Sequence, residues 1–271
     1  PAAPGTVCPS GARPVSYDVT AFETVIPLNG WGDHIADGLI YALTSRRAEI
    51  LANPGLTQPL VVRANVGDCV SVTFRNAIPG RRVGMHTDGL LQADPKVSDG
   101  ARVGANPDTT VAAGEVVTYT WYADEIGEAP LIDAANLDGA SPTHTSVQRG
   151  LYGAVVVHER GSTWHDQITG ADLLAPDGSA RATRLFADVR DPAGADYRSV
   201  ALVMLDENED VMTADGTAPS FPHETDVPGV HHEIPDSTFG INYRSEPLRN
   251  RARAMLDHRA GRIVTLPNGR R

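Results

Sequence analysis

Histidines with nearby carboxylates are the residues of this sequence whose types and spacing could do chemistry. His86 and Asp88 stand in the segment His-Thr-Asp-Gly, and His144 stands in Thr-His-Thr-Ser. Imidazole and carboxylate groups are common ligands of transition metals. Residues 223–233 form another group, which combines histidine with glutamate in a polar, proline-containing stretch. For both groups the alternative is a histidine that is solvated or hydrogen-bonded without a metal.

Other catalytic chemistries lack their sequence patterns. Cys8 and Cys69 do not form a C-x-x-C pair, so they do not indicate a zinc site. Serines occur near histidines, but the sequence has no G-x-S-x-G segment, which disfavours a hydrolase. Residues 99–110 are rich in Gly and Asp, yet they lack the regular spacing of a calcium-binding loop.

The two cysteines predict a disulfide bond in an oxidising compartment. A Cys8–Cys69 bond would stabilise the fold by about 3–4 kcal/mol through the entropy of the closed loop. It would also hold the N-terminal segment on the strand that contains Cys69. The alternative is a pair of buried free thiols.

Charge and hydropathy exclude two classes of partner. The sequence has 34 acidic and 23 basic residues, for a net charge of -11, which would repel a nucleic-acid backbone. It contains no apolar run long enough for a membrane-spanning helix. The start at Pro1, without Met, is the kind left by removal of a signal peptide, so a secreted or extracytoplasmic location is expected.

The hydropathy pattern predicts an all-β protein. In residues 69–76 Val70, Val72 and Phe74 alternate with polar side chains, and residues 115–123 alternate in the same way. Many short strands separated by Gly and Pro favour a β-sandwich or barrel. Helical patterns are few: about one turn near Leu39–Ser45, and a short surface helix over residues 245–256.

The order of these patterns predicts two units. The first unit covers residues 10–160, and a polar, turn-rich linker follows at 161–182. Strand patterns resume at Arg184, and the second unit, residues 183–271, has too few strands for a complete sandwich.

Several segments, in the same order, resemble the multicopper oxidase family, in particular its bacterial manganese-oxidase-like and ceruloplasmin/hephaestin-like branch. They are CPSGARPVSYDVTA, LVVRANVGDCVSVTFRN, MHTDGLLQADPKVSDGARVGANPDTTVAAGEVVTYTWYA, GLYGAVVVHERG and FGINYRSEPLRNR. The resemblance covers residues 8–160 well and 183–251 more loosely. It implies a cupredoxin-like Greek-key β-sandwich followed by a partial second cupredoxin-like unit.

The copper-ligand motifs of that family are incomplete in this sequence. The family's His-x-His pairs correspond here to His86 with Asp88, and to His144 without a second histidine two residues away. No His-Cys-His segment occurs, so the family's electron-entry copper site and complete trinuclear cluster cannot be built from this sequence. Because the family fold places both loops at one end of the sandwich, the resemblance implies that His86, Asp88 and His144 could bind one metal ion, with copper as the first candidate.

These observations lead to three hypotheses for function. The leading one is the N-terminal portion or a subunit of a multicopper-oxidase-like assembly, completed by a complementary chain or by C-terminal domains of the same oxidase. Cleavage at a basic site such as Arg270-Arg271, or a separate gene, would supply that second chain. The assembly would couple oxidation of a metal ion or phenol to reduction of dioxygen. The alternatives are a non-catalytic cupredoxin-fold binding or scaffold protein, and a mononuclear metalloenzyme that uses His86, Asp88 and His144.

Overall fold

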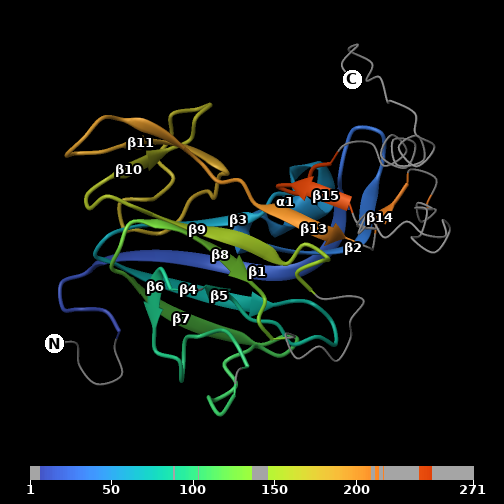
Figure 1. Cartoon of the computed structure of the whole chain (residues 1–271), viewed down its shortest axis with the longest axis horizontal. Coiled ribbons are helices and arrows are strands. Elements are labelled where there is room, and N and C mark those ends of the chain that lie inside the picture. Colours follow the sequence, from blue (N-terminus) through green and yellow to red (C-terminus); the bar gives the residue numbers. More distant parts are fainter. Residues whose placement is uncertain are drawn as a thin grey trace, which may run out of the picture.

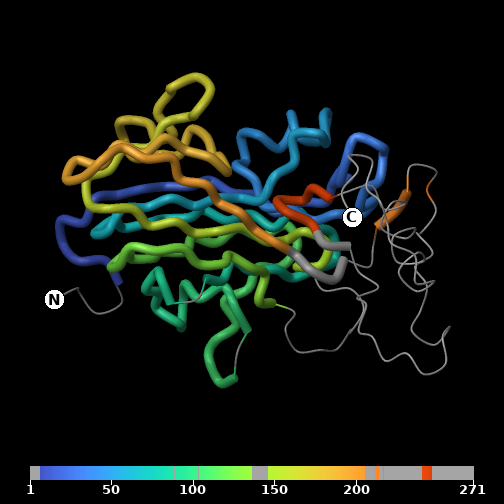
Figure 2. The backbone as a smooth tube through the Cα atoms, turned by 45° about the horizontal axis from the view of Figure 1, so that its top comes forward, coloured from blue at the N-terminus to red at the C-terminus, as the bar shows by residue number. Residues whose placement is uncertain are grey.

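The chain folds into an all-β sandwich with a smaller set of strands packed on one of its faces (Figures 1 and 2). The structure is a computed structural model, and it describes residues 7–87, 89–102, 104–135, 146–208, 211–213, 216 and 238–245. The predicted fold class is confirmed in these residues: the helical pieces are short, and strands make up both layers of the sandwich.

The first sheet has six strands, in the order β14-β2-β1-β4-β7-β6. Their bounds are Val211–Met212, His34–Leu43, Arg13–Pro27, Asp68–Asn76, Val116–Ala123 and Leu91–Ala93. β1 and β4 run parallel, with Arg13 opposite Asp68, whereas the other neighbours are antiparallel. The N-terminal strand is therefore a central strand of its sheet.

The second sheet has four strands, in the order β3-β9-β8-β5. Their bounds are Leu60–Asn65, Tyr152–His158, Gly127–Ile132 and His86–Thr87. Every residue of β3 and of β9 is buried. The first sheet covers one face of this pair, and residues 185–203 cover the other through the cluster of Val61, Val156 and Ala201. Burial on both faces explains the continuous apolar runs Leu60–Val62 and Ala154–Val157 within these strands.

The core between the sheets contains the side chains that the alternation places inward. Val70, Val72 and Phe74 of β4 are fully buried, as are Tyr119 and Trp121 of β7. The rings of Phe74 and Tyr119 stack with centroids 6.0 Å apart, and those of Tyr119 and Trp121 stack at the same spacing. Such stacked pairs stabilise a core beyond the area they bury.

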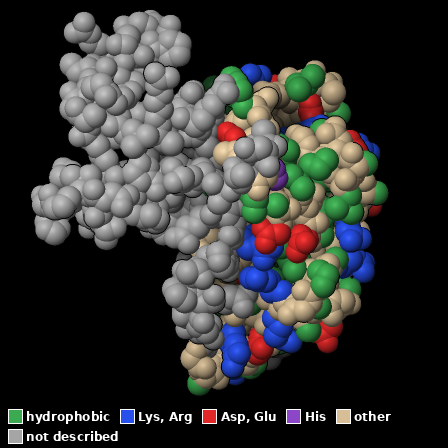
Figure 3. Space-filling model, turned by 90° about the vertical axis from the view of Figure 1, so that its right-hand side faces the viewer, with side chains coloured by type: hydrophobic (Ala, Val, Ile, Leu, Met, Phe, Trp, Pro, Cys, Tyr) green, Lys and Arg blue, Asp and Glu red, His purple; other side chains and the backbone are tan. Residues whose placement is uncertain are grey.

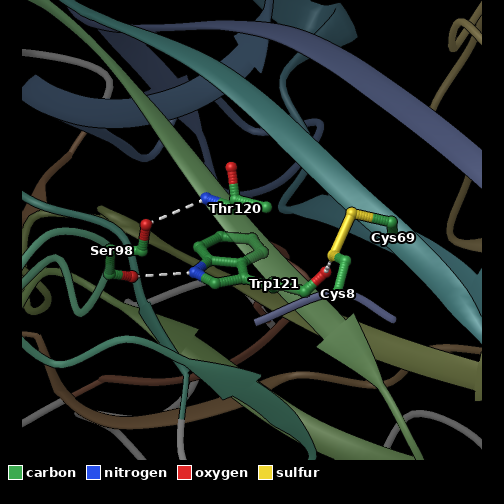
Figure 4. Close-up of a disulfide and its surroundings, with 5 residues drawn as sticks. All are labelled: Cys8, Cys69, Ser98, Thr120 and Trp121. Atoms are coloured by element: carbon green, nitrogen blue, oxygen red, sulfur yellow. Dashed lines mark hydrogen bonds between the residues drawn. A yellow bond between two sulfur atoms is a disulfide. The ribbon is translucent and has the colours of Figure 1, made fainter. Parts of the chain in front are cut away.

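The predicted disulfide bond between Cys8 and Cys69 is confirmed (Figure 4). The Sγ atom of Cys8 lies 3.6 Å from the carbonyl oxygen of Trp121, and the indole Nε1 of Trp121 donates to the carbonyl oxygen of Ser98. The backbone N–H of Thr120 donates to the Ser98 hydroxyl. The bond thus ties the N-terminal segment to β4, beside the core aromatic residues of β7.

The helical turn expected near Leu39–Ser45 is wrong over most of its length. β2 continues to Leu43, paired residue by residue with β1, and the helical pieces follow it. These are the 3-10 turn η1 (Thr44–Arg46), the helix α1 (Arg47–Ala52) and the 3-10 turn η2 (Pro54–Leu56). Residues Leu39–Leu43 are buried on both faces, which removes the period-2 signal of a strand. Residues 246–256 of the second expected helix lie outside the described residues.

The expected linker carries structure of its own. Within residues 161–182, β10 (Thr163–His165) pairs with β11 (Phe186–Arg190), which pairs in turn with β12 (Tyr197–Val200). Trp164 of β10 is buried in a small core with Leu173, Ala187 and Val189. β13 (Met204–Asn208) and β15 (Thr238–Ile241) form a separate pair. The boundaries of the two units stay a prediction.

Charged side chains of both signs are interspersed on the face shown in Figure 3. Among the described residues, no helix has the length and apolar character needed to cross a membrane.

Arg63 of β3 joins the sandwich to the strands that follow it. Its side chain is buried, with 2% of the residue surface exposed. Nη1 lies 2.8 Å from the Ser199 hydroxyl and 3.2 Å from Nε2 of His158. Nη2 donates to the carbonyl oxygens of Arg184 and Leu185. We call Arg63, His158, Tyr197 and Ser199 the Arg63 joint.

The proton on His158 is placed by its neighbours in this joint. A guanidinium group can only donate, so Nε2 of His158 accepts from Arg63, and Nδ1 carries the proton. Nδ1 then donates to the Tyr197 hydroxyl at 2.9 Å, which donates to Oε2 of Glu159 at 2.8 Å. Burial and the charge of Arg63 lower the pKa of His158 to about 3. His158 is therefore neutral in the folded protein near neutral pH.

This neutral histidine predicts a loss of stability in mild acid. In the unfolded chain His158 has a pKa of about 6.5, so the unfolded state binds the proton first as the pH falls. The contribution of His158 to the free energy of unfolding is therefore fully present above that pH, and it is lost progressively as the pH falls toward 3. Between pH 7 and pH 5 the loss from this group is about 2 kcal/mol. Urea unfolding of wild type and His158→Gln at both pH values should show a correspondingly smaller pH effect in the variant.

His34→Gln is the matched control, because His34 lies outside the Arg63 joint and its Nδ1 contacts a local carbonyl oxygen, that of Gly32. Its pH effect should equal that of the wild type. An equal pH effect in His158→Gln and His34→Gln would contradict the proposed neutral state of His158.

Candidate functional site

His86 opens β5, the edge strand of the second sheet. β5 pairs with β8, with His86 opposite Ile132. The Nδ1 atom of His86 lies 2.9 Å from the backbone carbonyl oxygen of Asp99 and 3.2 Å from its Oδ1 atom, and 19% of the side chain is exposed. Because a carbonyl oxygen only accepts, Nδ1 carries the proton, and the ring lone pair is on Nε2.

Two glycines allow the backbone to bring His86 and Asp99 together. A Cβ atom on Gly84 would overlap the backbone of Gly100, and one on Gly100 would overlap the backbone of Met85. Gly100 also has a φ of 70°, in the left-handed region that favours glycine. The segment that precedes His86 therefore lies directly against the segment that contains Asp99.

Asp133 is a buried carboxylate that binds the backbone before His86 and the residues on either side of segment 136–145. It is fully buried directly after β8, where its Oδ1 atom accepts from the N–H of Gly84 at 2.8 Å and from the N–H of Ala135 at 3.0 Å. Its Oδ2 atom accepts from the Ser146 hydroxyl. Asp133 thus connects the strand of His86 to the residues that flank 136–145.

Sequence reasoning did not identify Asp133 or Asp99. An aspartate after an apolar strand is the signal for Asp133, and it is a weak one because such residues are common in loops. Asp99 stands in the turn-rich segment 99–110, which the sequence does indicate as a loop. Neither residue has a spacing that reveals its long-range partners.

Of the three predicted metal ligands, the structure describes His86 alone. Asp88 and His144 lie outside the described residues, as do residues 223–233 of the second histidine group. In the part of the chain that the structure describes, no three His, Cys, Asp or Glu side chains gather as a metal-ligand group. The ligand set of His86, Asp88 and His144 stays a prediction.

The environment of His86 fits the role of a metal ligand. Histidines that bind metals usually donate their second ring N–H to a carbonyl or carboxylate oxygen, which fixes the tautomer and the ring orientation. Asp99 supplies both kinds of oxygen to Nδ1. In the predicted ligand set Nε2 would be the ligand atom, and imidazole nitrogen suits copper.

Comparison with known proteins agrees with this architecture. Residues 38–162 match the family model described as multicopper oxidase. That segment runs from β2 to the end of the second sheet and includes His86 and Asp133. None of the curated proteins compared with the sequence matches it.

Solved structures with a similar fold include copper proteins. A blue copper oxidase from Nitrosomonas europaea is 17% identical with a TM-score of 0.47, over 85% of this chain and 54% of that one. A copper nitrite reductase from the same organism is 21% identical with a TM-score of 0.39, over 55% and 42%. A multicopper oxidase from Campylobacter jejuni is 17% identical with a TM-score of 0.40, over 57% and 28%.

The chain therefore spans between 28% and 54% of the length of these three structures. The family model covers the sandwich from within β2 onward, without β1, and the two mixed sheets form the cupredoxin-like fold that the resemblance implies. Through this domain the chain is similar to the multicopper oxidase family.

Proposed function

We propose that this chain is the N-terminal portion or a subunit of a multicopper-oxidase-like assembly, and that it contributes few copper ligands of its own. The assembly would couple oxidation of a metal ion or a phenol to reduction of dioxygen. The family match supports this proposal over residues 38–162. Complementary domains or a complementary chain would supply the remaining ligands.

The open edge of β12 is the observation that carries the proposal. Among the described residues β12 pairs only with β11, at the end of a three-stranded sheet. Tyr197 and Val200 of this strand are 38% and 37% exposed. Open edges with apolar side chains promote association, and folded proteins usually cover them. Further strands from the complementary part would pair with this edge.

The chain's own residues would have a limited chemical role. Bound copper would supply electron transfer to dioxygen. His86 would bind copper through Nε2, while Asp99 holds the proton on Nδ1 and fixes the ring. Asp133 would connect the backbone of Gly84 to Ala135 and Ser146, which flank the segment that contains His144.

The disulfide bond supports a location outside the cytoplasm. Disulfide bonds persist in oxidising compartments and are rare in the cytosol of most organisms. We therefore include a secreted or extracytoplasmic location in the proposal.

Subunit composition and metal content of the same native sample test this function. Native mass spectrometry should detect a larger polypeptide or a second chain, and elemental analysis should find copper in the assembly. A 28.8 kDa monomer without copper would contradict the proposal and favour the scaffold hypothesis.

A mononuclear metal site is the second candidate function, and the contact of His86 with Asp99 favours it. We expect His86→Ala to remove one equivalent of bound copper, because the ligand atom Nε2 is lost. Equilibrium dialysis against copper, followed by elemental analysis, measures the change.

His34→Ala is the matched control for this experiment. Its Nδ1 also contacts a backbone carbonyl oxygen, but it lies at the start of β2, outside the predicted ligand set. This variant should keep the bound copper. Full copper binding by His86→Ala would rule out His86 as a ligand.

A further inference from the structure

A cavity of about 520 Å³ lies between the sandwich and the segments that follow it. One wall comes from the end of β2, from α1 and η2, and from the start of β3. The other wall comes from residues 182–186, 202 and 241–244. Figures 1 and 2 both show β15 beside the α1 region. A cavity of this volume is in the usual range for sites that bind small molecules.

Most of the cavity wall is apolar. The deep part includes Leu43, Ile50 and Leu60, which are buried. Leu202 lines the cavity and is 59% exposed, which places it at the mouth. An apolar body of a ligand would be removed from water between these side chains, which favours binding.

The charged groups of the cavity wall are arginines. Arg46, Arg184 and Arg244 line it, and none of the described lining residues is Asp or Glu. Arg46 pairs with Glu49 and Arg184 pairs with Asp166, so those two charges are offset. The positive charge of the cavity wall therefore comes from Arg244.

The guanidinium group of Arg244 donates to carbonyl oxygens. Nη1 lies 2.6 Å from the carbonyl oxygen of Pro27, and Nη2 lies 2.9 Å from that of Thr57 and 3.2 Å from that of Gly55. Burial lowers the pKa of Arg244, and the groups that oppose this effect are tyrosines, not carboxylates. Among the described residues Arg244 has no carboxylate partner, and a half-buried cation in this state favours an anion in the adjacent space.

The hydroxyl of Thr57 gives a second, independent indication. Thr57 lines the same cavity and is 2% exposed, and its Oγ1 atom has no hydrogen-bond partner among the described residues. A buried hydroxyl without a partner is costly, and most such groups bind another polar atom. The backbone carbonyl of Thr57 also accepts from Arg244, so Thr57 and the cation lie in the same part of the cavity wall.

We propose that this cavity binds an organic carboxylate with an apolar body. The carboxylate group would lie near Arg244 and the Thr57 hydroxyl, and the apolar body would lie against Ile50, Leu60 and Leu202. This site is separate from His86, which does not line the cavity. The proposal does not depend on a metal or on a complementary chain.

Calorimetric titration with 2-naphthoate tests the site, with 2-naphthalenemethanol as the neutral probe of similar shape. Saturable binding of the carboxylate is expected, with the alcohol about tenfold weaker because it has no charge to interact with Arg244. Equal affinities would overturn the proposal, and so would the absence of saturable binding of 2-naphthoate at millimolar concentration.

A pair of variants at the mouth separates charge from shape. Leu202→Glu should weaken binding of 2-naphthoate about tenfold through repulsion, whereas Leu202→Gln, with the same size and no charge, should change it less than about threefold. Leu202 is exposed, so neither variant should disturb the core. Equal effects of Glu and Gln would overturn the anionic character of the ligand.

Thr57→Val tests the position of the carboxylate. Valine keeps the shape of the buried side chain and removes the hydroxyl, so binding of 2-naphthoate should weaken about fivefold while the neutral alcohol is little affected. An equal loss for both probes would show that the hydroxyl does not contact the carboxylate, and it would overturn this placement.

Discussion

Replacement of Arg63 by methionine is expected to lower the free energy of unfolding by about 3–5 kcal/mol. Methionine fills a similar volume but donates no hydrogen bond. Ser199, His158 and the carbonyl oxygens of Arg184 and Leu185 would lose their donor. His158 belongs to the sandwich, whereas the other acceptors belong to residues 184–200. The variant should therefore weaken the attachment of residues 184–200 to the sandwich.

Urea denaturation measures this effect, and Arg75→Met is the matched control. Arg75 lies on β4 and pairs with Asp18 at the surface, at 3.3 Å. Exposed ion pairs contribute little, so the control should lose less than about 1 kcal/mol. Similar small losses in the two variants would contradict the role of Arg63 in the joint.

Removal of the disulfide bond by the double substitution Cys8→Ser and Cys69→Ser is expected to lower the free energy of unfolding by about 4 kcal/mol. The cysteines are 61 positions apart, and opening so long a loop increases the entropy of the unfolded chain. The N-terminal segment before β1 would also lose its attachment to β4. Thermal unfolding of the oxidised wild type and of the double variant measures the difference.

Reduction of the wild type provides the control for this prediction. Wild type in excess reductant should unfold at the temperature of the double variant, and the variant should not respond to reductant. If oxidised wild type and the variant unfold at the same temperature within experimental error, the bond does not stabilise the fold.

The two proposals about ligands concern different parts of the molecule. His86 belongs to β5, at the edge of the second sheet, whereas the carboxylate cavity lies between α1 and residues 241–244. Leu202→Glu should therefore leave copper binding unchanged, and His86→Ala should leave binding of 2-naphthoate unchanged.

Much of the sandwich could be predicted from local patterns. The alternation in β4 and β7 identified the buried side chains Val70, Phe74 and Trp121 correctly, because a half-buried strand exposes every second residue. The cysteine content also led to the correct disulfide bond. Several segments that resemble the multicopper oxidases, in the same order along the chain, indicated similarity to that family.

For the candidate site, the sequence by itself predicted His86 as a metal ligand. Its surroundings were decided by tertiary structure: Asp99, which contacts Nδ1, comes from a loop, and Asp133, which binds the N–H of Gly84, comes from the end of β8. Hydrogen bonds of this kind depend on which backbones meet in space, and no local period in the sequence reports that.

The largest differences from the sequence-based expectations have the same cause. Leu39–Leu43 form a strand instead of a helical turn because both of their faces are covered, and residues 163–165 pair with β11 within the expected linker. No local pattern predicts the surroundings of Arg63 or Arg244, yet packing buries one in the Arg63 joint and places the other at the cavity. Local alternation determined the strands, while long-range packing decided which polar groups became buried and with which partners.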